Sequence, residues 1–222
     1  DRHVHVACQV EVADHAAVGP ALGRLPLVQQ LQGAGLRGAG QRAGGEGGAE
    51  DVERVDLGSL LVPPEQGREL RLQVDEKTGN VQAVLLAGVD GALEIRAFAA
   101  PRNGDLWGDV RPQIAADMAR RGGTATEQEG TFGTELHCRM PVRRPDGSAA
   151  TQPSRIVGLN GSRWLLRGTF LGRPATEPEA AEAWERTLRT VAVRRGDHAM
   201  PVGEPLPIVL PDNARRVTPP TA

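Results

Sequence analysis

In the middle of the chain, apolar residues first recur at every second position, which predicts β-strands that have one buried face. Leu70, Leu72 and Val74 alternate with polar residues, and the run 81–89 is more continuously apolar, as in a central strand. Asp90-Gly91 then favours a tight hairpin into a further strand over residues 92–100. The pattern therefore predicts an antiparallel meander.

The spacing of the apolar residues then changes to the spacing of a helix. The residues that form the helical stripe are four positions apart, namely Leu106, Val110, Ile114 and Met118. Asp105 is placed to cap the first turn, and Gly122 follows the last. Pro112 lies inside the stripe, and an interior proline removes a hydrogen bond and costs about 3 kcal/mol. We therefore expect a short turn around Trp107 and the main helix from about Pro112.

Strand-like alternation returns over residues 124–130, 134–143, 151–160 and 162–171, with a strong hairpin signal at Asn160-Gly161. The apolar faces of these strands are formed by Leu136, Cys138, Met140 and Val142, and by Trp164, Leu166 and Phe170. A second helix is predicted to start at Thr176, which with Glu179 forms a capping box. Its predicted buried face comprises Ala181, Trp184, Leu188 and Val191.

The two ends of the chain differ from this regular part. Residues 31–50 are a Gly/Ala/Arg stretch with too little large apolar surface to offset the loss of chain entropy on folding. Before it, residues 3–12 alternate like a strand, although the sequence offers that strand no partner. We expect a low-complexity, disordered leader over residues 1–53, an α+β domain over 54–196 and a Pro-rich, extended tail over 197–222, whose apolar part, 206–210, lies on the domain surface.

Composition excludes several classes of function. The net charge is −2, which gives no electrostatic argument for nucleic acid or anionic lipid as a partner. No apolar run approaches the ~20 residues that a membrane span needs, and no signal peptide is recognisable, so we expect a cytoplasmic protein. The two cysteines form no C-x-x-C pair, and neither phosphate-binding nor dinucleotide-binding glycine patterns join a strand to a helix. We therefore expect no metal and no cofactor.

Few side chains suggest catalysis. His3, His5 and Cys8 have a spacing that could hold a metal, but they lie in the irregular leader, and Cys138 reads as a small buried hydrophobe. The acid–base candidates for an enzyme are Glu135, His137 and His198. No nucleophile with a matching base accompanies them, so the sequence carries no recognisable catalytic constellation.

Five separate segments of the chain together resemble the sequences of a known family: "RVDLGSLLVP", "AFAAPRNGDLW", "EGTFGTEL", "VGLNGSRWLLRGTFLGRPA" and "RGDHAMPVGEPLPIVLP". Over roughly residues 55–211, the chain resembles the actinobacterial family called domain of unknown function 3710. That family has no assigned activity, so the resemblance implies no catalytic residues. The order of elements is also similar to that of the PsbP and Ran-binding Mog fold. This similarity implies an α/β/α sandwich with an antiparallel sheet flanked by helices, in a fold whose members mostly bind or assemble.

These observations lead to one main functional hypothesis and two alternatives. The main hypothesis is a non-catalytic module that binds another protein, with Trp107 as the anchor and Arg102 and Arg111 as its polar rim. In the other interpretation of Trp107, the ring covers the core over Leu106 and Val110. The alternatives are an enzyme of unrecognised type and a nucleic-acid accessory protein. The arginines that would serve the latter are Arg143, Arg144, Arg155, Arg163 and Arg167.

Overall fold

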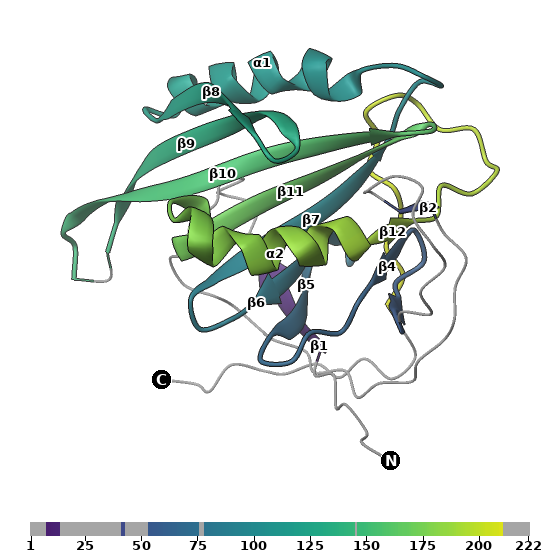
Figure 1. The fold of residues 1–222 in the computed structure, drawn as a ribbon, viewed down its shortest axis with the longest axis horizontal. Helices are drawn as coiled ribbons and strands as arrows, with labels where there is room; N and C mark the ends of the chain where they lie inside the picture. Colours follow the sequence, from purple (N-terminus) through teal and green to yellow (C-terminus); the bar gives the residue numbers. More distant parts are fainter. Residues whose placement is uncertain (1–7, 14–40, 43–52, 76–77, 145, 211–222) are drawn as a thin grey trace.

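The computed structural model of the chain describes residues 8–13, 41–42, 53–75, 78–144 and 146–210, the first two ranges by their backbone only (Figure 1). Within these residues, a large sheet of eight strands and a small sheet of four strands accompany two α-helices. Neighbouring strands are antiparallel, apart from the parallel pair of β1 and β5. The predicted α+β class, with an antiparallel sheet flanked by helices, is confirmed.

The strands of the large sheet are, in spatial order, β1 (Cys8–Ala13), β5 (Glu69–Asp75), β6 (Val81–Ala87), β7 (Gly91–Ala99), β11 (Trp164–Gly172), β10 (Ala149–Gly161), β9 (Gly133–Arg143) and β8 (Thr124–Gly130). The small sheet contains, in order, β2 (Gln41–Arg42), β12 (Ala192–Val193), β4 (Leu60–Val62) and β3 (Val55–Asp56). The helices are α1 (Leu106–Arg120) and α2 (Pro178–Thr190), and the short 3₁₀ turn η1 (Arg173–Ala175) precedes α2.

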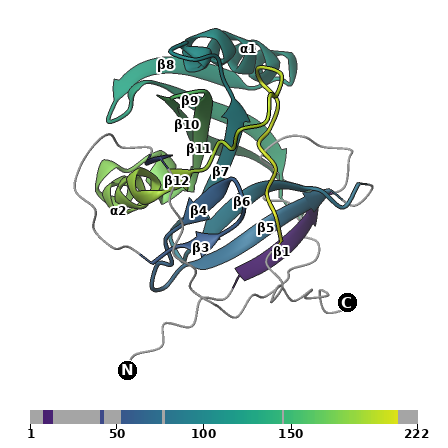
Figure 2. The ribbon, with the colours of Figure 1, turned by 90° about the vertical axis from the view of Figure 1, so that its right-hand side faces the viewer.

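Helices α1 and α2 lie on opposite faces of the large sheet, as two views at right angles show (Figures 1 and 2). This follows from the alternation along β11, because Trp164, Leu166 and Phe170 face α2 while Leu165 faces α1. Trp184 of α2 packs into the same core as the first three of these residues. The predicted packing of that strand face against α2 is therefore confirmed.

Helix α1 is continuous, so the predicted break at Pro112 is wrong. Asp105 caps the helix as predicted, because its side chain accepts a hydrogen bond of 2.8 Å from the Gly108 amide. Pro112 is exposed, and Gly108, whose carbonyl would have bonded to a residue-112 amide, is half-buried. The proline therefore removes one hydrogen bond on a partly exposed side of the helix without forcing the chain out of it.

The capping box predicted at Thr176 is also wrong. Thr176 ends the η1 turn, and its amide bonds the Arg173 carbonyl at 3.0 Å. Glu177 takes the N-cap position instead and makes no side-chain capping bond. The physical reason is Pro178, which occupies the first helical turn and holds the residue before it in an extended conformation. The predicted buried face of α2 is confirmed, since its four residues are at most 1% exposed.

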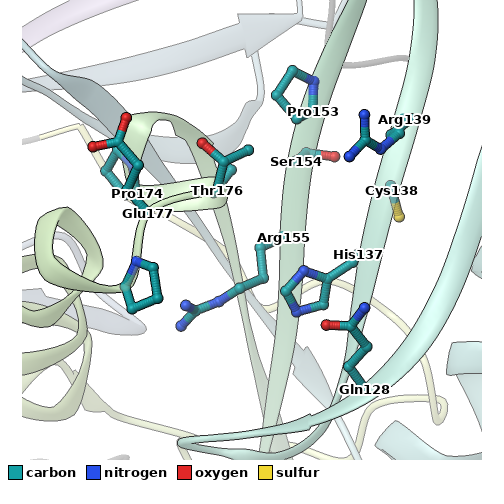
Figure 3. Close-up of a pocket in the computed structure, with 12 residues that line it drawn as sticks. Gln128, His137, Cys138, Arg139, Pro153, Ser154, Arg155, Pro174, Thr176 and Glu177 are labelled. Atoms are coloured by element: carbon teal, nitrogen blue, oxygen red, sulfur yellow. The ribbon is translucent and has the colours of Figure 1, made fainter.

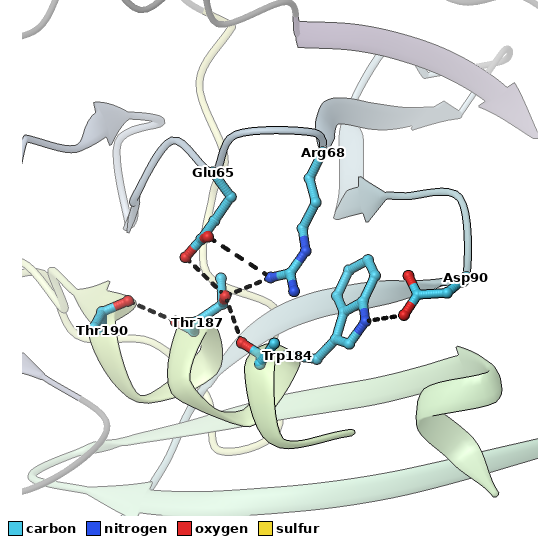
Figure 4. A network of polar contacts seen from close by, with 7 residues as sticks. Glu65, Arg68, Asp90, Trp184, Thr187 and Thr190 are labelled. Carbon is cyan, nitrogen blue, oxygen red and sulfur yellow. Dashed lines mark hydrogen bonds and ion pairs between the residues drawn. The ribbon is translucent and has the colours of Figure 1, made fainter. Parts of the chain in front are cut away.

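The segment before β5 is fastened to α2 by a polar network (Figure 4). Arg68 donates to the Thr187 hydroxyl at 2.6 Å, and that hydroxyl donates to Glu65 at 2.9 Å. The Arg68 guanidinium also lies over the Trp184 ring, 3.8 Å from its centroid. These contacts explain how the β4–β5 connection covers the edge of the main core.

Residues beyond 196 are partly integrated into the domain. Leu206 is 3% exposed in the main core, and its amide donates to the Ala97 carbonyl of β7. The expectation that Leu206 lies on the surface is therefore wrong, because β7 has backbone groups beyond its pairing with β6 that residues 203–206 satisfy. Val209 and Leu210 are exposed, as expected.

At the N-terminal end, residues 8–13 form a strand, as their alternation predicts, and β5 is its partner. Most of the predicted leader lies outside the described residues, including His3, His5 and nearly all of the low-complexity stretch.

Candidate functional site

A pocket of about 320 Å³ opens between the strands at one end of the large sheet and the start of α2 (Figure 3). Its floor comes from β8, β9 and β10, and its other wall from η1 and the first residues of α2. The side chains that line it are mainly polar or proline: Gln128, His137, Arg139, Pro153, Arg155, Pro174, Thr176, Glu177 and Pro178.

A buried ion network lies beside this pocket. Arg155 of β10 contacts Glu135 of β9 with 3.1 Å between Nε and Oε2, and it donates through Nη2 to Glu185 of α2. Glu135 is 1% exposed, and Arg155 and Glu185 are each 8% exposed. One guanidinium thus holds two buried carboxylates, and the network ties two strands of the pocket floor to α2.

The hairpin that connects β8 and β9 closes over Glu135. The Phe132 amide donates to Glu135 Oε1 at 3.2 Å, and a Cβ atom on Gly130 would overlap the carboxylate. Burial raises the pKa of Glu135, although Arg155 and the Phe132 amide act in the opposite direction. The carboxyl is therefore buried in the protein interior, in contact with the hairpin that connects β8 and β9.

His137 lies in the pocket lining and is the second ionisable side chain there, after Arg155, that approaches Glu135. Its Nε2 atom is 4.0 Å from Glu135 Oε2, and burial, together with the charge of Arg155, lowers the pKa of the imidazole. The structure thus brings together two of the three acid–base candidates. The third, His198, is exposed in the segment after β12, where its carbonyl accepts a hydrogen bond from Arg195.

The strand β8 forms the edge of the large sheet next to the pocket. It pairs with β9 on one side only, and six of its seven residues are exposed. Glu127 and Glu129 are alternate residues and point to the face that carries α1, whereas Gln128 points into the pocket. An unpaired strand edge presents backbone N–H and C=O groups to whatever lies beside it.

Comparison with known families settles the relationship of the chain. Residues 45–217 match the family model described as protein of unknown function (DUF3710). The chain belongs to this family. No curated protein and no solved structure matches it. Because the description assigns no activity to DUF3710 proteins, the roles of the residues must come from the geometry of the site.

In this DUF3710 protein, Trp107 is buried at 4% exposure. Its indole nitrogen donates to the Thr134 carbonyl at 2.8 Å, and its amide donates to the Asn160 side chain at 3.2 Å. The ring therefore fills the core under α1. Arg111 reaches that surface and donates to Glu127 of β8 at 2.8 Å, while Arg102 is exposed in the loop before α1.

The five arginines considered for nucleic acid do not form one face of this DUF3710 domain. Arg155 is in the buried ion network, whereas Arg167 lies on the opposite face of the sheet near Glu94, which is 3.7 Å away. Cys138 is 1% exposed, and burial raises the pKa of its thiol to about 11, as fits a small buried hydrophobe. No group of acidic, His and Cys side chains that could hold a metal occurs among the described residues.

The sequence interpretation missed Glu185 and the part that Arg155 plays in the pocket floor. A signal for Glu185 is present, because it lies four positions after Ala181 and three before Leu188, on the apolar stripe of α2. A charged residue on such a stripe requires a buried partner.

No described helix of this DUF3710 protein is long and apolar enough to cross a membrane.

Proposed function

We propose that this DUF3710 protein is a non-catalytic module that binds another protein, and that an extended segment of the partner adds to the sheet beside β8. The observation that carries this proposal is the edge of β8, which is exposed along most of its length and is paired on one side only. In recognition by strand addition, main-chain hydrogen bonds supply much of the affinity.

The pocket adds a means of selecting the segment. Gln128 belongs both to β8 and to the pocket lining, so the binding edge and the pocket are contiguous. Pockets that accept alternate side chains of an added strand give this mode of binding its specificity. The prolines on the α2 side of the pocket have φ fixed by their rings and so lose less backbone freedom when a ligand binds, which favours a preformed site.

The surface predicted around Trp107 belongs to the same proposal. Arg111 connects α1 to β8 through Glu127, so a segment beside β8 would also contact this helix. Trp107 would act from beneath by holding the start of α1 in place, and Arg102 would extend the rim into the preceding loop. In this arrangement the partner contacts Arg111 and Arg102 directly but does not contact the Trp107 ring.

The other proposed features are broader. The two-faced arrangement of α1, the sheet and α2 supports a relationship to the PsbP and Ran-binding Mog fold. We also propose an actinobacterial origin, a cytoplasmic location and a boundary between leader and domain near residue 53. Limited proteolysis tests that boundary, because cleavage before residue 53 should precede cleavage within residues 54–196.

An enzyme remains the second candidate because Glu135 and His137 lie 4.0 Å apart beside a pocket. A carboxyl with a raised pKa next to an imidazole can transfer protons. Glu135, however, already accepts the Phe132 amide and contacts Arg155, and its side chain is almost fully buried. These contacts and the burial of Glu135 favour a structural role for the pair of Glu135 and His137, and they favour binding as the function of the pocket.

Two neighbouring proline variants, Thr126→Pro and Glu127→Pro, test strand addition. Alternate N–H groups of an edge strand point toward and away from its neighbour, so one variant disturbs the pairing with β9 and the other removes an outward donor. The variant that removes an outward donor should keep the wild-type melting temperature and should no longer capture the partner from an extract of the native cell. Cross-linking from β8 should place the partner segment.

If the folded outward variant captures the same partner equally well, strand addition is wrong. If the purified protein converts a substrate and Glu135→Gln or His137→Gln removes that activity, the protein is an enzyme instead.

A further inference from the structure

The free edge of β8 is acidic and carries no basic residue. Its sequence is TATEQEG, in which Glu127 and Glu129 are both exposed and lie on one face of the strand. The residues on its other face, Thr124, Thr126 and Gln128, are uncharged. A segment that pairs with β8 would therefore meet negative charge on one face only.

This negative charge is only partly compensated within the described residues. Glu127 receives the Arg111 guanidinium at 2.8 Å, whereas Glu129 accepts a hydrogen bond of 2.7 Å from the Thr134 hydroxyl and has no cation within ion-pair distance in the part of the chain that the structure describes. The negative charge of Glu129 also contributes to the raised pKa of the nearby Glu135. The edge is thus a negatively charged strand on which the exposed Glu129 is the less compensated of the two glutamates.

We propose that the segment added to β8 carries lysine or arginine at alternate positions and uncharged residues between them. This inference rests on the proposed function, strand addition, and specifies the partner. On the face shared with α1, one basic side chain would lie opposite Glu129, and the other would lie opposite Glu127 and share its carboxylate with Arg111. Opposite charges directly across two strands stabilise the pair, and like charges destabilise it.

The same charges disfavour a second copy of this chain as the occupant. Antiparallel pairing of two β8 strands centred on Glu127 sets this residue opposite its own copy. Pairing centred on Gln128 sets Glu127 opposite Glu129 of the other copy, twice over. Both arrangements place like charges directly across the ladder, whereas a basic segment removes the repulsion.

Glutamates on an edge strand can also serve only to prevent aggregation. The experiment must therefore separate a binding edge from a protected one. The full-length, isotope-labelled protein is titrated by NMR with the peptide Thr-Lys-Thr-Lys-Thr-Lys-Thr and with its counterpart in which glutamate replaces lysine. At low salt the basic peptide should shift the β8 amides and bind at least about tenfold more tightly, and this preference should shrink as salt screens the charges.

Charge exchange provides the matched control. The variant Glu127→Lys/Glu129→Lys should reverse the preference in favour of the acidic peptide. The variant Glu182→Lys/Glu204→Lys makes the same change in net charge at exposed positions outside β8 and should leave the preference as it is in the wild type. Both variants are first compared with the wild type in thermal unfolding.

Four results would overturn the proposal. Equal shifts of β8 by both peptides would retain strand addition but reject the basic partner. Absence of β8 shifts with either peptide would mean that the glutamates only protect the edge, and the proline variants would then judge strand addition separately. A preference that survives the Glu127→Lys/Glu129→Lys exchange would show that the peptide binds elsewhere. Dilution-dependent β8 shifts without peptide, together with a dimer mass, would make a second copy the occupant.

Discussion

Gly158 of β10 lies directly beneath the indole ring of Trp107, and a Cβ atom at position 158 would overlap that ring. Gly158→Ala should therefore push the ring and α1 away from the sheet and cost about 1–3 kcal/mol of unfolding free energy. Urea unfolding measures this loss. In a Trp107→Leu background, where the ring is absent, the same glycine substitution should cost clearly less, and equal costs in the two backgrounds would contradict the contact.

Burial of Trp107 also predicts what its removal does. Trp107→Ala should lower the free energy of unfolding by about 3–5 kcal/mol, as should Trp184→Ala, because each ring is at most 4% exposed. Arg102→Ala, at an exposed position, should change it by less than about 0.5 kcal/mol. Thermal and urea unfolding of the three variants test this ranking. A Trp107→Ala protein as stable as the wild type would mean that the ring is a surface anchor after all.

The sequence predicted the elements well where the apolar period was long and regular. The buried face of α2 and the Trp164–Phe170 face of β11 follow directly from spacing, because a buried stripe or face is a local property of the chain. The errors at Pro112 and Thr176 have a common cause, because each rule depends on the surroundings of the backbone. A proline is tolerated inside a helix where its turn is partly exposed, and a threonine does not cap a helix where it already ends a preceding turn. Neither condition can be read from the residues themselves.

The candidate site was less accessible to prediction. Glu135 and His137 were identified as acid–base candidates, but the network in which Arg155 links Glu135 to Glu185 joins two strands to a helix far along the chain. The sequence interpretation considered Arg155 only among the arginines of the nucleic-acid alternative, although it is the buried cation of this network. Long-range pairing of this kind is set by strand order, and the order β11-β10-β9-β8 became visible only in the fold.

The central position of Arg155 makes a further prediction. Arg155→Leu would leave the carboxylates of Glu135 and Glu185 buried without their shared cation, so we expect a loss of about 3–5 kcal/mol. Replacing all three residues by apolar ones of similar volume should recover much of that loss, because no uncompensated charge then remains. Urea unfolding of the single and triple variants tests the pair. If Arg155→Leu alone is neutral, water must reach the carboxylates and the network is not buried.

Glu135 makes the stability of the domain depend on pH. Burial raises its pKa in the folded protein above the value of about 4.3 in an unfolded chain. The folded state then binds the proton more tightly, so the contribution of this carboxyl is fully present below the unfolded pKa and is lost as pH rises through the folded pKa. Each unit of the rise corresponds to about 1.4 kcal/mol.

Glu135→Gln cannot ionise, and its amide oxygen can still accept the hydrogen bond from the Phe132 amide. Between pH 4.5 and 8, the unfolding free energy of the wild type should therefore fall relative to that of Glu135→Gln. Because burial and Arg155 lower the pKa of the neighbouring His137, the comparison is repeated in a His137→Gln background, where the same difference should persist. Parallel pH profiles of wild type and Glu135→Gln in both backgrounds would mean that the Arg155 guanidinium fully compensates the burial of Glu135.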